Sequence, residues 1–139
     1  MQQIDKKIQN YIKEHHLLTF AVCDKKSPYC ANCFYAYLDK SLIFASDIDT
    51  KHIKMALLNP NIAGTISKET KNIGKIQGIQ FVAKMKMDIS FGEKEIYFKR
   101  FPFAKLHNPL LWSIKLKFIK FTDNTLGFGK KLIWEERGC

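Results

Sequence analysis

The sequence predicts a mainly β fold: a closed or nearly closed antiparallel barrel with a few short helices. Three observations lead to this fold class. Six or seven short apolar segments rich in strand-forming residues recur along the chain. Short turns join the first of them, as expected for antiparallel neighbours. The 139 residues are 46% hydrophobic and 13% aromatic, which suits a single domain over residues 1–139 and is too apolar for disorder.

The N-terminal third predicts one helix and an antiparallel meander of three strands. Apolar residues recur at helical spacing opposite charged ones over residues 2–16, which predicts an amphipathic helix. The cluster Asp24-Lys25-Lys26-Ser27-Pro28 predicts a turn, and Asp39-Lys40 predicts a tighter one. The three strands around these turns are expected at residues 17–23, 29–37 and 42–46.

The remaining elements alternate helices with strands. Thr50 is the expected N-cap of a helix over residues 51–58, which Asn59-Pro60 ends because the residue before proline avoids helical geometry. A second short helix is expected over residues 93–101, before Pro102. The alternation of side chains slips at residues 119–121, which predicts a β-bulge there. Further strands are expected at residues 62–67, within 74–89, and at 112–121 and 132–134.

The chain carries a formal net charge of +10, from 23 lysines and arginines against 13 acidic residues. Such a surface attracts phosphates on nucleic acids, lipids or small molecules, but scattered lysines are equally typical of a solvated surface. Only Arg100 and Arg137 are arginines, and arginine is the residue that reads guanine with two hydrogen bonds. Nucleic-acid binding is therefore not expected.

Four cysteines occur without a secretory leader, which predicts free thiols and a cytoplasmic protein: Cys23, Cys30, Cys33 and Cys139. Cys30 and Cys33 form a CxxC, but in a strand these positions point to opposite faces. We therefore expect both to be small buried packing residues, and we expect no metal site. No apolar run reaches the roughly 18 residues of a membrane span, so no membrane partner is expected.

One segment has the chemistry of an anion site. The third strand leads through Asp47-Ile48-Asp49 into a helix that starts with Thr50, Lys51 and His52. Backbone N–H groups and the positive end of the helix dipole favour a phosphate at such a place. An ordinary N-cap with exposed basic neighbours explains the same residues, and both interpretations stay open. The glycines of a nucleoside-triphosphate loop are missing.

Two other segments suit a flat ligand. Thr122 and Asn124 lie in a polar, glycine-containing stretch between apolar strands and could contact a planar ring, although the same residues are typical of a turn. Asn32 lies among Phe34 and Tyr35, consistent either with a ring against a strand or with core packing.

Five strings together resemble the YhbP family: Tyr29-Cys30-Ala31-Asn32-Cys33-Phe34-Tyr35, Thr50-Lys51-His52, Gly78-Ile79-Gln80-Phe81, Arg100-Phe101-Pro102 and residues 121–131. That family is similar to the FMN-binding split barrels related to pyridoxamine 5'-phosphate oxidase. The resemblance implies a six-stranded antiparallel split β-barrel that forms a homodimer with FMN at the subunit interface.

The resemblance also implies site residues. Thr50, Lys51 and His52 would hold the FMN phosphate, while Ala45 and Ser46 would lie along the isoalloxazine ring. With the flavin so placed, Asn32 would touch the ring and Thr122 or Asn124 would approach it from the far side of the barrel. His52 stands where the oxidases carry a second cation, and residues 28–34 contain no arginine or lysine. These departures favour flavin binding over that particular oxidase activity.

Three functions follow from these observations. The first is an FMN-dependent oxidoreductase with a small-molecule substrate of unknown identity and no assigned catalytic residue. A second is a haem-binding split barrel with an axial ligand from His15, His16 or His107. The third is a non-catalytic basic barrel that binds anions or nucleic acid. Alternation at residues 112–118 separates aromatic residues from lysines, which disfavours the third.

Overall fold

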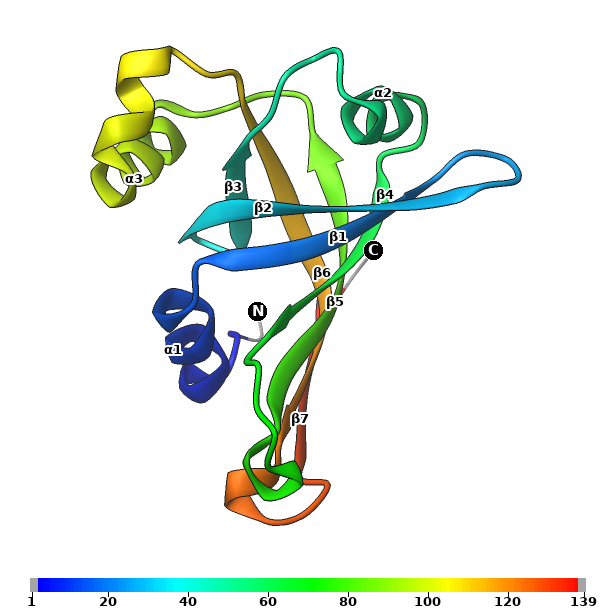
Figure 1. Cartoon of the computed structure of the whole chain (residues 1–139), viewed down its shortest axis with the longest axis vertical. Helices are drawn as coiled ribbons and strands as arrows, with labels where there is room; N and C mark the ends of the chain where they lie inside the picture. Colours follow the sequence, from blue (N-terminus) through cyan, green and yellow to red (C-terminus); the bar gives the residue numbers. More distant parts are fainter. Residues whose placement is uncertain (1–2, 138–139) are drawn as a thin grey trace.

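The computed structural model describes residues 3–137 and contains a seven-stranded antiparallel sheet with strand order β3-β2-β1-β4-β5-β6-β7 (Figure 1). Because β3 also pairs with β6, six strands close into a barrel, and β7 extends the sheet beyond β6. The predicted fold class is confirmed. The elements are α1 (Lys6–Glu14), β1 (Leu17–Cys23), β2 (Pro28–Leu38), β3 (Ser41–Ala45), α2 (Lys51–Leu58), β4 (Asn61–Ser67), β5 (Gln77–Lys86), α3 (Phe91–Arg100), β6 (Leu111–Asp123), β7 (Lys131–Glu135) and the 3-10 turns η1 (Ile73–Lys75), η2 (Pro102–His107) and η3 (Asn124–Leu126).

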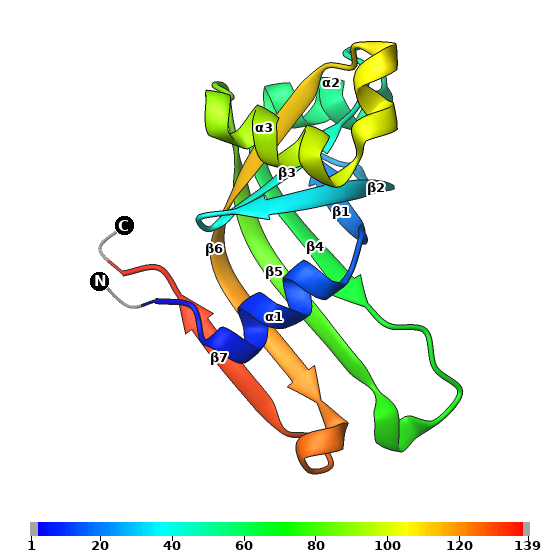
Figure 2. The same cartoon turned by 90° about the vertical axis from the view of Figure 1, so that its left-hand side faces the viewer.

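The first helix, α1, is shorter than the expected 2–16 and packs its apolar side on the sheet (Figure 2). Asp5 caps it by accepting a hydrogen bond from the backbone N–H of Lys7 at 2.8 Å. Ile8, Tyr11 and Ile12 are buried, and the Tyr11 hydroxyl donates to the carbonyl of Gln77 at 3.1 Å. The helix therefore packs over β5. Its C-cap residue, His15, has an extended backbone, and β1 follows.

The irregularity in β6 lies two residues before the predicted position. Val82 pairs with Phe118 whereas Ala83 pairs with Leu116, so Lys117 is the additional residue. Inward-facing positions change phase there, from Leu116 to Ile119. The alternation over residues 112–118 predicts that Phe118 shares the buried face of Ile114 and Leu116, but Phe118 instead lies opposite the exposed Val82.

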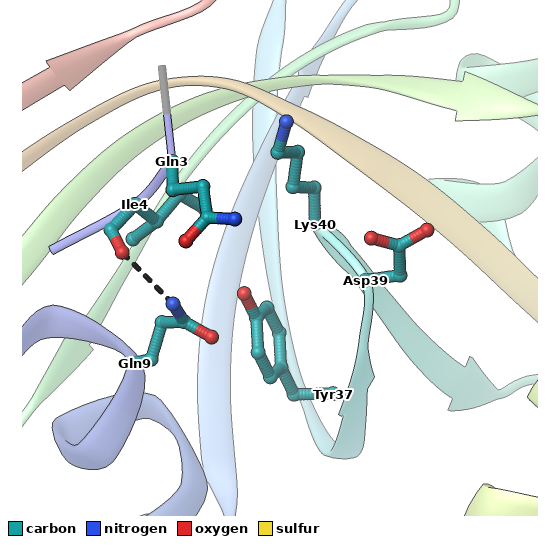
Figure 3. A pocket seen from close by; sticks show the side chains of 6 residues that line it. All are labelled: Gln3, Ile4, Gln9, Tyr37, Asp39 and Lys40. Carbon is teal, nitrogen blue, oxygen red and sulfur yellow. Dashed lines mark hydrogen bonds between the residues drawn. The ribbon is translucent and has the colours of Figure 1, made fainter. Parts of the chain in front are cut away.

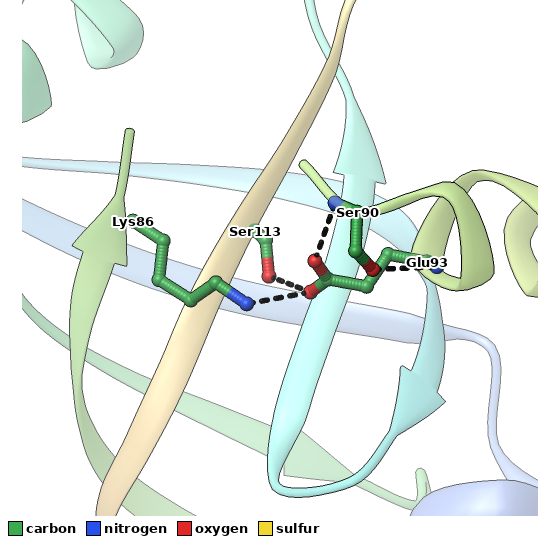
Figure 4. A network of polar contacts seen from close by, with 4 residues as sticks. All are labelled: Lys86, Ser90, Glu93 and Ser113. Carbon is green, nitrogen blue, oxygen red and sulfur yellow. Dashed lines mark hydrogen bonds and ion pairs between the residues drawn. The ribbon is translucent and has the colours of Figure 1, made fainter. Parts of the chain in front are cut away.

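The start of α3 is fixed by a buried carboxylate (Figure 4). Ser90 and Glu93 form a reciprocal capping box, which starts the helix at Phe91 rather than at 93 as predicted. Glu93 is only 3% exposed, and its Oε2 accepts hydrogen bonds from Ser113 Oγ at 2.5 Å and Lys86 Nζ at 3.0 Å. Ser113, expected on the lysine face of its strand, is buried for this reason.

Burial by itself raises the pKa of the Glu93 carboxyl, because the charged form loses water. Hydrogen bonds from Ser113, the Ser90 backbone and Lys86 outweigh this effect and hold the pKa below its usual value. The carboxylate is therefore charged at neutral pH and joins β5, α3 and β6.

The end of α3 is held by Arg100. Its guanidinium donates to the carbonyl of Tyr35 at 3.2 Å, to that of Lys13 at 3.1 Å and to that of His15. One side chain therefore ties α3 to β2 and to the end of α1. No helix in the described residues is long and apolar enough to span a membrane.

Replacing Ser113 with alanine removes the hydroxyl that donates to the buried Glu93 carboxylate. We expect the free energy of unfolding to fall by about 1.5–3 kcal/mol, the range for hydrogen bonds to charged groups. Urea unfolding at pH 7 measures the change. Ser27→Ala, at an exposed position of the loop between β1 and β2, is the control. An equal loss in both variants would contradict the role given to Ser113.

Candidate functional site

Ser46, the residue that follows β3, is held from two directions by the start of β6. Its backbone N–H donates to the carbonyl of Leu110 at 3.1 Å. Its own carbonyl accepts a hydrogen bond from the indole Nε1 of Trp112 at 2.8 Å. These bonds fix the chain at the point where it leaves the barrel and turns toward α2.

Thr50 caps α2, as predicted. Its Oγ1 accepts from the backbone N–H of Ile53 at 3.4 Å and donates to the carbonyl of Asp47 at 2.8 Å. No acidic residue occupies the first turn of this eight-residue helix, so nothing there neutralises the positive end of its dipole. Asp47 and Asp49 lie in the preceding turn and are exposed.

His52 joins the two hydroxyl residues into one cluster. Its Nε2 lies 2.6 Å from Ser46 Oγ and 3.3 Å from Thr50 Oγ1, and its ring packs edge-on against Phe20. Burial lowers the pKa of His52, so the imidazole is neutral at pH 7. Ser46, Thr50 and His52 thus form one cluster, whereas the sequence analysis expected Ser46 beside the ring and Thr50 and His52 at the phosphate. Their role as cofactor ligands stays a prediction.

The proton on His52 decides which groups of this cluster can donate to a ligand. The hydroxyl proton of Thr50 already goes to the Asp47 carbonyl. When Nε2 of His52 lacks a proton, the Ser46 hydroxyl donates to it. Protonation of His52 reverses that bond and frees the Ser46 proton. The cluster therefore accepts an anion best when His52 is charged.

Lys51 lies beside this cluster and is exposed. Its Nζ stands 4.7 Å from the centroid of the Tyr29 ring, a cation–π distance. Tyr29 belongs to β2, so the contact places the ammonium over the β1–β2 hairpin. With His52 protonated, the Ser46 hydroxyl, the Lys51 ammonium and the helix N-terminus form a set of donors and positive charges that suits a phosphate monoester.

Asn32 and Ala45 lie outside the cluster formed by Ser46, Thr50 and His52. Asn32 is exposed on the outward face of β2, where its Oδ1 accepts from Thr19 Oγ1 at 2.5 Å. Ala45 is half-buried at the end of β3 and packs against the cluster of apolar residues under α3.

Thr122 and Asn124 lie at the opposite end of the sheet from α2, where the turn between β6 and β7 is drawn in orange in Figure 1. Both polar atoms of the Asn124 side chain are engaged at this end of the sheet. Nδ2 donates to the carbonyl of Ile73 in η1, and Oδ1 accepts from the N–H of Gly129, both at 2.9 Å. A single chain does not bring these two residues to Thr50. A shared site would require a second subunit.

The two cysteines of the CxxC point to opposite faces of β2, as expected, since Cys33 pairs with Leu18 and Cys30 with Ala21. Cys30 was expected to be buried, and this is wrong: it lies on the outward face and is exposed. Cys33 packs against the core, where burial raises its thiol pKa to about 12. Cys139 lies outside the described residues.

The histidines proposed as haem ligands differ in their surroundings. His15 is engaged, with Nδ1 2.8 Å from the carbonyl of Tyr11 and its ring stacked on Tyr11. His16 is exposed beside Phe101. Its pKa is lowered mainly by desolvation and, to a smaller extent, by the positive charge of Arg100. His107 is exposed in η2. Within residues 3–137 no group of three or more His, Cys, Asp or Glu residues could hold a metal ion.

A separate polar pocket of about 390 Å³ lies between α1 and the β2–β3 turn (Figure 3). Gln9 donates from Nε2 to the carbonyl of Ile4 at 2.8 Å in its wall. Lys40 reaches toward the Trp134 ring, 5.8 Å from its centroid. None of the site residues predicted from the sequence lines this pocket, so the pocket is separate from the cluster of Ser46, Thr50 and His52.

Three residues that support the cluster were not identified from the sequence: Phe20, Tyr29 and Trp112. Each falls in a strand, and its pattern there indicates only packing. Their contacts with His52, Lys51 and Ser46 depend on pairings between segments far apart in the chain, for which one sequence gives no signal.

Curated relatives show which family the chain belongs to, although no family model matches it. It is 43% identical over 132 residues to a UPF0306 protein of Campylobacter jejuni, covering 93% of this chain and 96% of that one. It is 39% identical over 132 residues to a UPF0306 protein of Cronobacter sakazakii, covering 91% and 92%.

Solved structures share the fold at low sequence identity. A haem-binding protein from Mycobacterium smegmatis matches with a TM-score of 0.76 at 9% identity, over 97% of this chain but only 60% of that one. A FAD-binding protein from Mesorhizobium loti matches with a TM-score of 0.67 at 13% identity, over 84% and 92%. These likenesses establish the architecture alone, whereas the extent and identity of the curated matches show that the chain belongs to the UPF0306 family.

Proposed function

We propose that the protein binds FMN and acts as a flavin-dependent oxidoreductase in the cytoplasm. The observation that carries the proposal is the cluster at the start of α2, where Ser46, Thr50 and His52 meet a helix whose first turn has no acidic residue. This donor set fits the phosphate of FMN. The resemblance of the chain to YhbP proteins supports the same assignment. Its fold similarity to the FAD-binding protein from Mesorhizobium loti supports it as well.

In this proposal the chain's residues bind and orient the cofactor. Thr50, Lys51 and His52 hold the phosphate. Ser46, in contact with His52, lies between the phosphate and the ring, and Ala45 borders the ring. The bound flavin supplies hydride or electron transfer. Asn32, Thr122 and Asn124 contact the ring only if a second subunit brings them to it, so the proposal includes a homodimer.

The outward face of the barrel supports a homodimer. The exposed or half-buried positions of β1, β2 and β4 on this face carry no charged side chain, in a chain with 23 lysines and arginines: Leu17, Thr19, Ala21, Cys23, Pro28, Cys30, Asn32, Phe34, Asn61, Ala63, Thr65 and Ser67. Depletion of charge is typical of the centre of a protein interface. We propose that two subunits meet across this uncharged face.

Haem binding is the second candidate function. The haem-binding neighbour from Mycobacterium smegmatis favours it, and so does His16, an exposed imidazole beside Phe101. His15 is a poorer ligand because its Nδ1 and one ring face are already in contact with Tyr11. A Soret band on haem addition that His16→Ala removes and His107→Ala preserves would favour this candidate over FMN.

Replacing Lys51 with alanine removes a cation from the proposed phosphate site and leaves the Thr50 cap intact. We expect FMN affinity to fall about tenfold, as for the loss of a charge-assisted contact. Quenching of FMN fluorescence on titration with protein measures the affinity. Lys54→Ala, an exposed lysine further along the same helix, should bind like the wild type. Equal binding by Lys51→Ala and wild type would contradict the site.

FMN affinity should also depend on pH through His52. A bound phosphate favours the charged imidazole and raises the pKa of His52, which burial lowers in the free protein. Affinity should therefore rise as pH falls from 8 toward about 6.5, by up to roughly tenfold per unit of pKa change. His52→Gln, uncharged throughout, should flatten this dependence and controls for titration of the phosphate. The same slope in both proteins would exclude His52 as its cause.

The homodimer predicts a particle of twice the 16.2 kDa chain mass in light scattering at micromolar concentration. Ala63→Lys places a charge at the centre of the uncharged face, and its self-repulsion should produce monomers. Thr70→Lys, in the loop after β4, is the control and should remain dimeric. A monomeric wild type, or a dimeric Ala63→Lys, would contradict this interface.

A further inference from the structure

The connection between β5 and β6 exposes large apolar side chains that neither the barrel nor the proposed flavin site uses. It comprises α3, η2 and the segments that flank them, at the upper end of the molecule in Figure 1. Five of its apolar side chains are at least half exposed: Met87 (72%), Phe91 (76%), Phe103 (81%), Leu106 (80%) and Leu110 (51%). A group of this size on one connection differs from the single exposed apolar residues of ordinary surfaces.

The geometry of η2 sorts apolar from basic residues. A 3-10 helix has three residues per turn, so Phe103 and Leu106 lie on one side while Pro102 and Lys105 lie on another. Pro102 and Lys105 face α3 across a groove of about 700 Å³, which Lys94, Glu95 and Lys99 also line, so three lysines stand against one carboxylate there. A protruding pair of apolar side chains therefore stands beside a groove bordered by three lysines. We call Lys94, Lys99, Phe103, Lys105 and Leu106 together the α3–η2 face.

Charge decides which partner suits this face. The acidic residues of the connection are Asp88, Glu95 and Glu93, and Glu93 is buried and paired with Lys86. Basic side chains therefore predominate on the exposed part. A second copy, docked symmetrically here, would bring lysines against lysines, which is unfavourable. An anionic partner is favoured instead.

We propose that the α3–η2 face docks on the surface of an anionic lipid membrane. The interfacial region of a bilayer accepts apolar side chains at the acyl boundary and lysines at the level of the headgroups. Phe103 and Leu106 supply the first, and Lys94, Lys99 and Lys105 the second. The protrusion of the apolar pair suits a deformable surface, whereas a protein partner would need a matching pocket. This proposal departs from the sequence-based expectation of no membrane partner, which rested on the lack of an apolar run long enough to span a bilayer.

Sedimentation of the full-length protein with lipid vesicles tests the proposal. Vesicles of phosphatidylcholine with about 30% phosphatidylserine should bind at least about tenfold more tightly than phosphatidylcholine alone. The double variant Phe103→Ser/Leu106→Ser should lose about tenfold of that binding. A triple variant, Lys94→Gln/Lys99→Gln/Lys105→Gln, should lose a similar amount and show a weaker dependence on salt.

The matched control is Phe128→Ser. Phe128 is 82% exposed and lies near Lys130 and Lys131 in the chain, so it resembles Phe103 in type, exposure and charge environment. It lies at the other end of the sheet and should bind vesicles like the wild type.

Four results would overturn the proposal. They are absence of binding to anionic vesicles, equal binding to neutral ones, an equal loss in Phe128→Ser, and a change of oligomeric state in the double variant on light scattering. The last would assign the face to a contact with another copy. The double and triple variants leave the uncharged barrel face and the proposed flavin site unaltered, so FMN titration of both verifies their fold independently. Circular dichroism verifies the fold of Phe128→Ser, whose turn belongs to the proposed flavin site.

Discussion

Five residue pairs join β3 to β6, from Ser41 opposite Lys115 to Ala45 opposite Leu111, and this contact closes the barrel. Two connections depend on it. Beyond Ala45 the chain leaves the sheet as Ser46, still bonded to Leu110 and Trp112, and turns into α2. Before Leu111 it arrives from α3 and η2. Closure of the barrel therefore determines where the start of α2 and the α3–η2 face lie.

At position 52 of the proposed phosphate site, a side chain that packs against Phe20 takes the place of a permanent cation. A second permanent cation at position 52 would be costly against the buried ring of Phe20, because a charged group loses water there. A neutral imidazole fits that surface and keeps contact with Ser46 and Thr50. The consequence is that an anion would bind together with a proton. Lys51, exposed above Tyr29, would supply the permanent charge.

Local signals in the sequence were sufficient for the strands, the barrel class and the Thr50 cap, because alternation, turn residues and capping residues act over short distances. They were insufficient where a residue's position depends on a distant partner. Ser113 is buried because Glu93, twenty residues earlier, needs a donor. Lys117 becomes the additional residue of β6 through its register with β5. Likewise, the sequence suggested Asn32, Thr122 and Asn124 as ring contacts, while the fold places Asn32 on the outward face of β2 and the other two at the opposite end of the sheet from α2.

A crystal structure of the protein with FMN is the most direct measurement of the central claim. The account predicts two subunits joined across β1, β2 and β4, with the phosphate within hydrogen-bond distance of Thr50, Lys51 and His52. It also predicts that residues of the partner's β6–β7 turn approach the ring. A phosphate bound elsewhere, or FMN seated in the polar pocket beside Tyr37, would contradict it.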